Sequence, residues 1–303
     1  MTHHGKLRPM RCACIDIGSN TTRLLVAERG TGGAVLRDVA ADRAFTRLGA
    51  GRAPDGTIAP ERIAAVAAVV AAQVAQARAA GATALRAVAT AAVRDAPNQH
   101  ALCAMVEARA GVRVEVIDAE HEARLAFAGA TGTLAAAPGP DEQVGVVDVG
   151  GGSTELVCGT VGAGVSWVRS FPIGSGVLTE RHVRGECPSA AELEALRSEV
   201  ARALAGLEPP APGAAYAVGG SATSLGRLTG GRLHPASLAC ALDALCSGPV
   251  DDVARRLGLH PDRVRMLPAG IVVLGEAARA LGVPLQIASG GLREGVILAM
   301  WAG

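Results

Sequence analysis

Apolar residues recur along the chain with two alternating spacings. The runs at 11–17 and 24–28 have the two-residue alternation and the composition of β-strands. Residues 60–80 instead carry apolar side chains every three or four positions, with Pro60 in the first turn and Gly81 after the last. The pattern therefore predicts two strands followed by a long helix.

The alternation continues through the rest of the chain. Val88 lies in the next predicted strand, Asn98 can cap a helix over 99–110, and Asp118 can cap another after a strand at 112–117. Further signals are a strand at 144–149, a capping box formed by Ser189 and Glu192, and a helix from there to about Leu207. Strands that alternate with helices indicate an α/β protein with largely parallel or mixed sheets.

Length and charge describe an ordinary globular chain. The 303 residues include 29 Lys and Arg against 28 Asp and Glu, a net charge of +1. Single cores stop growing at about 250 to 300 residues, so we expect two lobes. No apolar run is long enough to span a bilayer, and Met1 to Pro9 lack the apolar region of a signal peptide. We therefore expect a cytoplasmic protein with no membrane partner.

Composition excludes several classes of chemistry. Lys6 is the one lysine in the chain, so neither a P-loop nor a buried Schiff-base lysine can be assembled. Aromatic residues are only 2%, and the net charge is near zero, so nucleic acid is not expected as a partner. The seven cysteines are odd in number and contain no Cys-x-x-Cys pair, which predicts neither a disulfide framework nor a zinc site.

An internal repeat is the most informative feature. Residues 15–25 (IDIGSNTTRLL) lie over residues 147–157 (VDVGGGSTELV) with no gap. Each copy reads as strand, Asp, glycine turn, hydroxyl residues and strand, so a duplication predicts two related lobes with their turns facing each other across a cleft. Such turns suit a polyphosphate because glycines let backbone N–H groups approach phosphate oxygens. Further glycine clusters at 219–223 and 289–294 follow strand-like runs and can place amides at helix starts.

At this point the chain resembles the exopolyphosphatase and guanosine pentaphosphate phosphohydrolase (Ppx/GppA) family, which has the two-lobed actin and hexokinase type of fold. The matching segments, in family order, are residues 16–24, 88–94, 122–125, 148–155, 171–174 and 219–223. The resemblance implies the short two-domain form. It places residues 1–128 and a C-terminal helix at 291–303 in a phosphate-binding lobe, and 129–290 in a second actin-like lobe.

The resemblance also implies roles for individual residues. Glu122 matches the catalytic base of the family, although the Glu that usually precedes it is His121 here. The neighbouring Glu120 has Arg124 at i+4 and is explained by a helix ion pair. Asp148 and Glu155 are expected to hold Mg²⁺, or Mn²⁺, with Asp16 as a further metal contact. The expected phosphate-binding residues are Gly18, Ser19, Asn20, Thr21, Arg23, Arg94, Gly151, Gly152, Ser153, Thr154, Gly220 and Ser221.

The function implied is metal-assisted release of terminal orthophosphate from inorganic polyphosphate, with guanosine pentaphosphate (pppGpp) as a second substrate and a homodimer as the assembly. Two alternatives stay open. One is a nucleotide-dependent kinase or ATPase of the same fold, which needs an adenosine pocket in the second lobe. The other is a catalytically inactive sensor of polyphosphate or nucleotide, which His121 favours.

Overall fold

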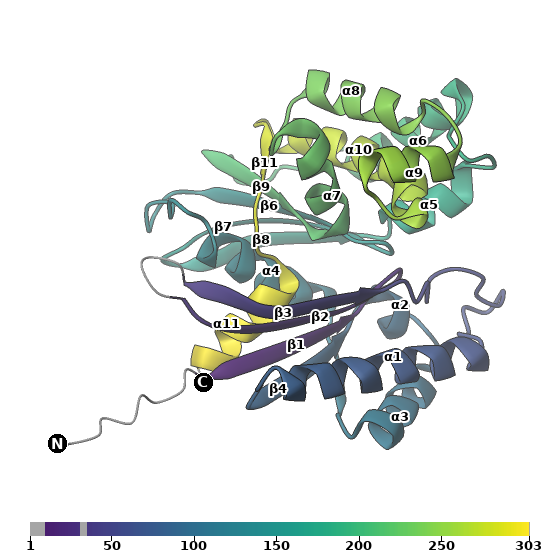
Figure 1. Ribbon diagram of the computed structural model, residues 1–303. Helices are drawn as coiled ribbons and strands as arrows, with labels where there is room; N and C mark the ends of the chain where they lie inside the picture. Colours follow the sequence, from purple (N-terminus) through teal and green to yellow (C-terminus); the bar gives the residue numbers. More distant parts are fainter. Residues whose placement is uncertain (1–9, 31–34, 303) are drawn as a thin grey trace.

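A computed structural model describes residues 10–30 and 35–302, which form two lobes that each contain one β-sheet (Figure 1). Lys6 and the predicted tail from Met1 to Pro9 lie outside the described residues. Within those residues, none of the helices is long and apolar enough to cross a membrane.

The first lobe contains a five-stranded sheet in the order β3-β2-β1-β4-β5. Strand β1 runs antiparallel to β2 and parallel to β4. The elements of this lobe are β1 (Arg11–Ile17), β2 (Thr22–Arg29), β3 (Leu36–Ala44), α1 (Pro60–Ala79), β4 (Ala84–Ala89), α2 (Ala91–Arg94), α3 (Gln99–Ala110) and β5 (Val114–Val116).

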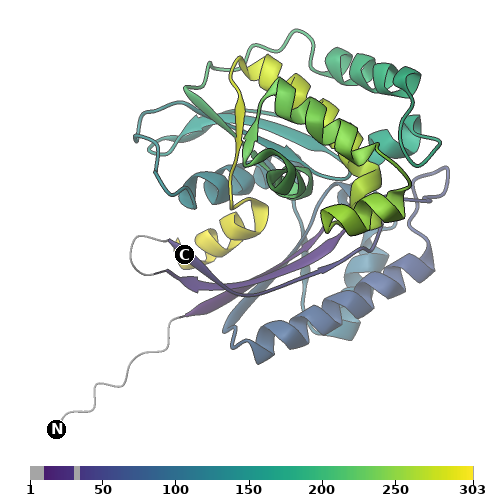
Figure 2. The same ribbon diagram turned by 45° about the horizontal axis from the view of Figure 1, so that its top comes forward.

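The second lobe contains a six-stranded sheet in the order β10-β11-β9-β6-β7-β8, with most of its helices on the outer side (Figure 2). Its elements are β6 (Val144–Val149), β7 (Thr154–Thr160), β8 (Gly164–Phe171), α5 (Ser175–His182), α6 (Ala190–Ala203), β9 (Ala214–Val218), α7 (Gly219–Thr229), β10 (Arg232–Leu233), α8 (Pro235–Leu245), α9 (Val250–Leu257), α10 (Pro261–Leu281) and β11 (Leu285–Ile287).

The two sheets repeat one topology. Strand β6 runs antiparallel to β7 and parallel to β9, just as β1 runs antiparallel to β2 and parallel to β4. The order β8-β7-β6-β9-β11 in the second sheet therefore matches β3-β2-β1-β4-β5 in the first. The predicted duplication and the predicted two-lobed α/β fold are confirmed.

Strand alternation sends neighbouring residues of β1 to two different cores. Ala13, Ile15 and Ile17 pack with helices α1 and α3, whereas Cys12 and Cys14 pack on the other face. Because successive side chains alternate, Asp16 shares the face of the two cysteines, which is the face toward the second lobe. Both cysteines are fully buried and pack as small hydrophobic side chains.

Two helices lie between the sheets, α4 (Ala119–Gly132) and α11 (Leu292–Ala302) (Figure 1). Leu125 of α4 packs with α11 and the first sheet, whereas Phe127 packs with β6, β7 and β9 of the second. The domain boundary predicted after residue 128 therefore falls within a helix that serves both lobes, and the division remains a prediction.

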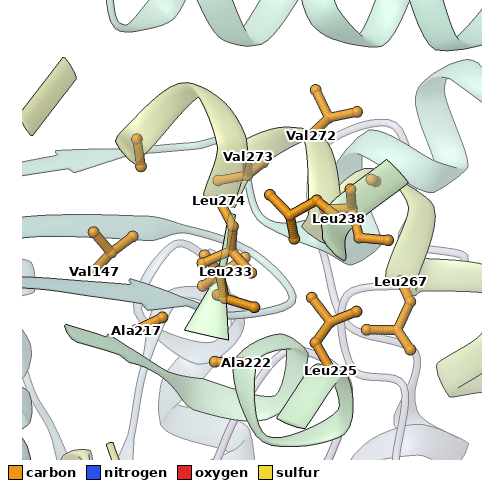
Figure 3. Close-up of a cluster of buried hydrophobic side chains, with 14 of the residues drawn as sticks. Val147, Ala217, Ala222, Leu225, Leu233, Leu238, Leu267, Val272, Val273 and Leu274 are labelled. Carbon is orange, nitrogen blue, oxygen red and sulfur yellow. The ribbon is translucent and has the colours of Figure 1, made fainter. Parts of the chain in front are cut away.

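The second lobe has the larger core. Leu225 of α7, Leu267 and Leu274 of α10, and Val147 of β6 are all fully buried in it (Figure 3). At roughly 1.5–3 kcal/mol for each fully buried large aliphatic side chain, this packing fixes α7 and α10 against the sheet. The ends of both helices that carry site residues are therefore held by a rigid core.

Most predicted helix ends are observed. Pro60 begins α1, Gly111 ends α3 in the left-handed conformation, and the Asp118 carboxylate accepts a 2.7 Å hydrogen bond from His121 N. The capping box of Ser189 and Glu192 is also present, although its helix ends at Ala203 and not near Leu207.

Asn98 occupies the predicted N-cap position of α3, but its side chain makes no capping hydrogen bond. It instead exchanges two hydrogen bonds with the backbone of Ile58, forty residues away. A side chain with both a donor and an acceptor can match an entire backbone unit of a distant loop, which sequence spacing does not reveal.

The prediction about disulfides is also wrong for one pair. Cys187 and Cys246 form a disulfide, with their Cα atoms 5.5 Å apart. The pair joins the connection between α5 and α6 to the C-terminal end of α8, two segments 59 residues apart that only the folded lobe brings together.

Candidate active site

The two glycine turns of the repeat have the same backbone hydrogen bond. Gly18 N donates to Thr21 O in the first turn, and Gly150 N donates to Ser153 O in the second, each at 3.0 Å. The turns face each other so closely that a Cβ atom on Gly152 would overlap Ser19 Oγ. A larger residue at Gly152 would therefore force Ser19 to move, because the two lobes meet at this point.

Helix α5 fixes the second turn from behind. Ser175 N donates to Gly150 O at 2.9 Å, and the amides of Gly176 and Val177 both donate to Gly151 O at 3.0 Å. The first amides of α5 are therefore used to hold the turn, and its glycines keep one conformation.

A cavity of about 100 Å³ lies between the two turns. Twelve of the residues predicted for the site line it: Asp16, Gly18, Ser19, Asn20, Thr21, Arg23, Glu122, Asp148, Gly151, Gly152, Ser153 and Gly220. Residues that are far apart in the sequence, from both lobes and from α4, thus converge on one space.

Buried carboxylates lie on one side of this cavity. Asp148 and Glu155 are paired directly across β6 and β7. Burial, and then the charge of Glu155, raise the pKa of Asp148 to about 7. Burial also raises the pKa of Glu122 well above its usual range, again with Glu155 as the next cause. Three carboxylates in a dry site repel one another, which favours binding of a cation or a proton.

Arg94 is the cationic partner of Glu122. Arg94 Nη1 donates to Glu122 Oε2 at 2.9 Å and to Ile117 O at 3.1 Å. This guanidinium is only about one-fifth exposed and does not line the cavity. Arg94 therefore forms an ion pair that orients Glu122, and its pairing with phosphate remains a prediction.

Three arginines also line the cavity: Arg23, Arg263 and Arg293. Burial, and the charges of Arg293 and Arg43, lower the pKa of Arg23 to about 9. Burial and the charge of Arg43 lower the pKa of Arg263 to about 10. The nearby carboxylates of Asp16 and Glu294 offset this repulsion at Arg23 only in part, so a bound anion would stabilise these cations further.

The Nε atoms of Arg23 and Arg263 are buried and have no hydrogen-bond partner. A buried donor without an acceptor is costly, and a phosphate oxygen is the kind of acceptor that relieves it.

Two helices begin at the cavity. Gly219 and Gly220 open α7, and Gly290 and Gly291 precede α11. Helix N-termini favour anions because their first amides and the helix dipole point outward. Gly219 has a φ of +85°, and a Cβ there would overlap the Asp148 carboxylate, so only glycine fits.

Four predicted residues do not line the cavity. Thr154 Oγ1 donates to Ile173 O, and Ser221 is fully buried against Gly270 of α10. Glu155 accepts a 2.8 Å hydrogen bond from Ser170 Oγ. Together with Arg94, these residues lie behind the cavity wall and act on it through their neighbours.

Several lining residues were absent from the predicted set: Thr90, Ser175, Gly219, Thr223, Arg263, Ser289, Gly290, Gly291, Arg293 and Glu294. The glycine cluster at 289–294 was recognised as an anion-binding candidate without being assigned. Arg263 offered no signal, because it lies in an ordinary amphipathic helix outside both copies of the repeat.

Magnesium is the cofactor that the predicted chemistry implies. Among the described residues, no three His, Cys, Asp or Glu side chains gather closely enough to hold a metal by themselves. Mg²⁺ does not need such a cage, because it is usually held by one or two carboxylates while substrate phosphates and waters complete its octahedron. Asp148, which lines the cavity and has a raised pKa, fits that requirement.

The residues that flank Glu122 on α4 point elsewhere. Arg124 Nη2 donates to Glu120 Oε1 at 2.7 Å, and both side chains are largely exposed, so the predicted helix ion pair is confirmed. His121 is exposed and does not line the cavity. Its replacement of the usual Glu therefore leaves the cavity walls unchanged.

Comparison with known proteins gives consistent results. The family model described as the Ppx/GppA phosphatase family matches residues 25–302. Exopolyphosphatase 2 of Mycobacterium tuberculosis is 33% identical over 297 residues, which cover 89% of this chain and 91% of that protein.

Solved structures agree with this result. The Aquifex aeolicus member of the Ppx/GppA family superposes with a TM-score of 0.79 at 28% identity and covers 97% of this chain and 98% of its own. An exopolyphosphatase from Cytophaga hutchinsonii superposes with a TM-score of 0.85 at 21% identity, covers 97% of this chain and 98% of its own, and supports the fold alone.

Proposed function

The chain belongs to the Ppx/GppA phosphatase family, and we propose that it is an exopolyphosphatase that releases terminal orthophosphate from inorganic polyphosphate. The observation that carries this proposal is the cavity between the facing glycine turns, which is lined by both carboxylates and buried arginines. A phosphoanhydride needs positioning and charge neutralisation more than covalent chemistry, and this cavity offers both.

The size of the cavity also supports a polyphosphate end. A space of about 100 Å³ can hold a terminal phosphate, whereas sites for drug-sized ligands usually measure about 300 to 1,000 Å³. The rest of the substrate must therefore extend outward from the cavity.

Glu122 acts as the general base in this mechanism. It lines the cavity, Arg94 fixes one of its oxygens, and burial raises its pKa, which makes the carboxylate a stronger base. Its free oxygen orients a water molecule toward the terminal phosphorus and accepts the proton of that water. Arg94 limits the range of positions that the carboxylate can adopt.

The remaining residues bind the substrate and offset its charge. The guanidiniums of Arg23, Arg263 and Arg293 neutralise charge that develops on the phosphate oxygens. Backbone amides of the two turns and of α7 donate hydrogen bonds to the polyphosphate. Asp148, with Glu155 opposite it, would hold Mg²⁺, which neutralises phosphate charge when it is bound.

Of the two alternative hypotheses, that of a kinase or ATPase requires an adenosine pocket beside α7. The described residues that line the cavity include no aromatic side chain on which a base could stack. The hypothesis of a catalytically inactive sensor was based on His121, which does not line the cavity. Both observations favour the exopolyphosphatase.

Four properties of the protein remain predictions: Mg²⁺ as its metal ion, pppGpp as a second substrate, a homodimer as its assembly and a cytoplasmic location. Disulfides are rare in the cytosol, so the redox state of Cys187 and Cys246 in cells tests the last of these.

A phosphate-release assay tests the proposal. Purified protein is given polyphosphates of several lengths, pppGpp and ATP, each with and without Mg²⁺. We expect Mg²⁺-dependent release from polyphosphate with no added nucleotide. A requirement for ADP, or ATP as the best substrate, would replace the proposal with the kinase or ATPase reading. Binding without release would support the sensor.

A further inference from the structure

The two lobes also touch outside the cavity. Arg47 follows β3 in the first lobe, and its Nε and Nη2 atoms donate to the two carboxylate oxygens of Asp262 at 2.7 and 2.6 Å. Asp262 lies in the first turn of α10 in the second lobe. Beside this pair, the Phe45 ring stacks on the His260 imidazole with centroids 3.8 Å apart. We name these four side chains the interlobe clasp.

The clasp is connected to both halves of the candidate active site. Arg47 N donates to Asn20 O at 2.9 Å, so its backbone is bonded directly to the first glycine turn. At the other end, Asp262 is followed immediately by Arg263, which lines the cavity. The Arg47–Asp262 pair therefore links the first turn to the segment that carries Arg263.

The backbone at Arg47 has an uncommon conformation. Its φ of +49° makes it the one non-glycine residue with positive φ among residues 10–30 and 35–302. Such a conformation is uncommon for a long side chain and persists where surrounding contacts enforce it. Here the Asn20 carbonyl accepts from its amide, and Arg62 Nη1 donates to its carbonyl at 3.0 Å.

The clasp borders a second cavity of about 270 Å³, which Arg47 and Asp262 line together with Ser19, Asn20 and Gly151 of the two turns. Arg47 is about half exposed, so the pair contributes little to folding stability. Open space and solvent beside the pair allow it to separate without disrupting either hydrophobic core.

We propose that Arg47 and Asp262 are positioning residues that hold the lobes at the spacing in which the first glycine turn and Arg263 grip the same phosphate. The identity of that ligand rests on the proposed function. Without the pair, the lobes spend time further apart, and a substrate must first bring them together. The apparent affinity then falls by the fraction of molecules in the competent arrangement.

The test uses Arg47→Gln, Asp262→Asn and the double variant in the full chain. Small-angle X-ray scattering without substrate should give a larger radius of gyration for each variant, and tripolyphosphate should restore the wild-type value. If the competent fraction falls to about one-tenth, KM should rise about ten-fold. Saturating substrate closes the lobes, so kcat should stay within about two-fold.

Controls separate positioning from loss of structure. Asp252→Asn removes an ion pair within α9 that does not cross the lobes, so it should change neither the scattering nor KM. Arg47→Lys keeps the charge but loses the two-pronged contact, so it should lie between wild type and Arg47→Gln. The double variant should be no worse than either single variant, because both break one contact.

Unchanged scattering together with unchanged KM in Arg47→Gln and Asp262→Asn would overturn the clasp, as would multiplicative effects in the double variant. Should one of these variants fail to fold, the comparison of Arg47→Lys with wild type decides the matter by the same two readouts. The scattering measurement needs no hydrolysis, so a wild-type protein that cannot cleave polyphosphate would overturn the proposed function and leave the clasp intact.

Discussion

Replacing Asp148 with Asn should make the metal-free protein more stable while it removes activity. Burial and Glu155 raise the pKa of Asp148 from 3.8 to about 7, so the folded protein binds this proton more tightly than the unfolded chain does. As pH rises from about 4 to 7, ionisation therefore favours the unfolded state, and stability falls across that window. Asn has the shape of the protonated acid but does not ionise, so the variant is not destabilised in this way as pH rises.

The size of the effect follows from the shift. At 1.36 kcal/mol per pKa unit, the ionised carboxylate destabilises the fold by roughly 4 kcal/mol at pH 8 and by about half of that at pH 5.5. In a chain of this length, the difference at pH 8 amounts to a rise in Tm of about 8 °C, at roughly 2 °C per kcal/mol.

The assay is denaturant or thermal unfolding in EDTA at both pH values, with Asp141→Asn as a control in an exposed loop. Asp148→Asn should have a higher free energy of unfolding than wild type at pH 8, and about half of that increase at pH 5.5. The control should show no increase at either pH. A variant that is less stable than wild type at pH 8, or equally shifted at both pH values, would refute the reasoning. Addition of Mg²⁺ should stabilise wild type at pH 8 and leave the variant unchanged.

Three further predictions follow from the same site and its supports. Glu122→Gln should bind polyphosphate but lower kcat by about 10² to 10⁴, with little change in KM, because Gln cannot accept a proton; Glu120→Gln is the control, and a larger loss at Glu120 would show that the wrong carboxylate was chosen. Wild-type activity should fall as pH drops below about 7, because protons then compete with metal at Asp148, and a flat profile from pH 5 to 8 would contradict the raised pKa. Cys187→Ser should lower the free energy of unfolding by about 2–4 kcal/mol under oxidising conditions and not in reductant, as denaturant titration would show.

The repeat made half of the site predictable. Thr21 and Ser153 occupy matching places in two copies of one pattern, so a duplicated fold had to bring both turns to one cleft. Strand alternation then placed Asp16 and Asp148 on the faces that meet, since both residues share their strand faces with side chains packed between the lobes.

The other half depends on contacts between distant segments. Arg263 lies on α10 with no motif around it, and only the packing of that helix on the second sheet brings its guanidinium to the cavity. The ion pair between Arg94 and Glu122 forms because α2 and α4 approach each other, and no spacing in the sequence indicated it. Cys187 and Cys246 likewise meet through the packing of two loops. Local periodicity contains no information about such pairings.

The central claim is that water, oriented by Glu122, attacks the terminal phosphate of polyphosphate. Its most direct test is digestion of polyphosphate in oxygen-18 water with Mg²⁺ and no nucleotide, followed by mass analysis of the orthophosphate formed. We predict one solvent oxygen in each released phosphate, and loss of that release in Glu122→Gln. Release that requires a nucleotide acceptor, or that proceeds at the wild-type rate in Glu122→Gln, would contradict the account.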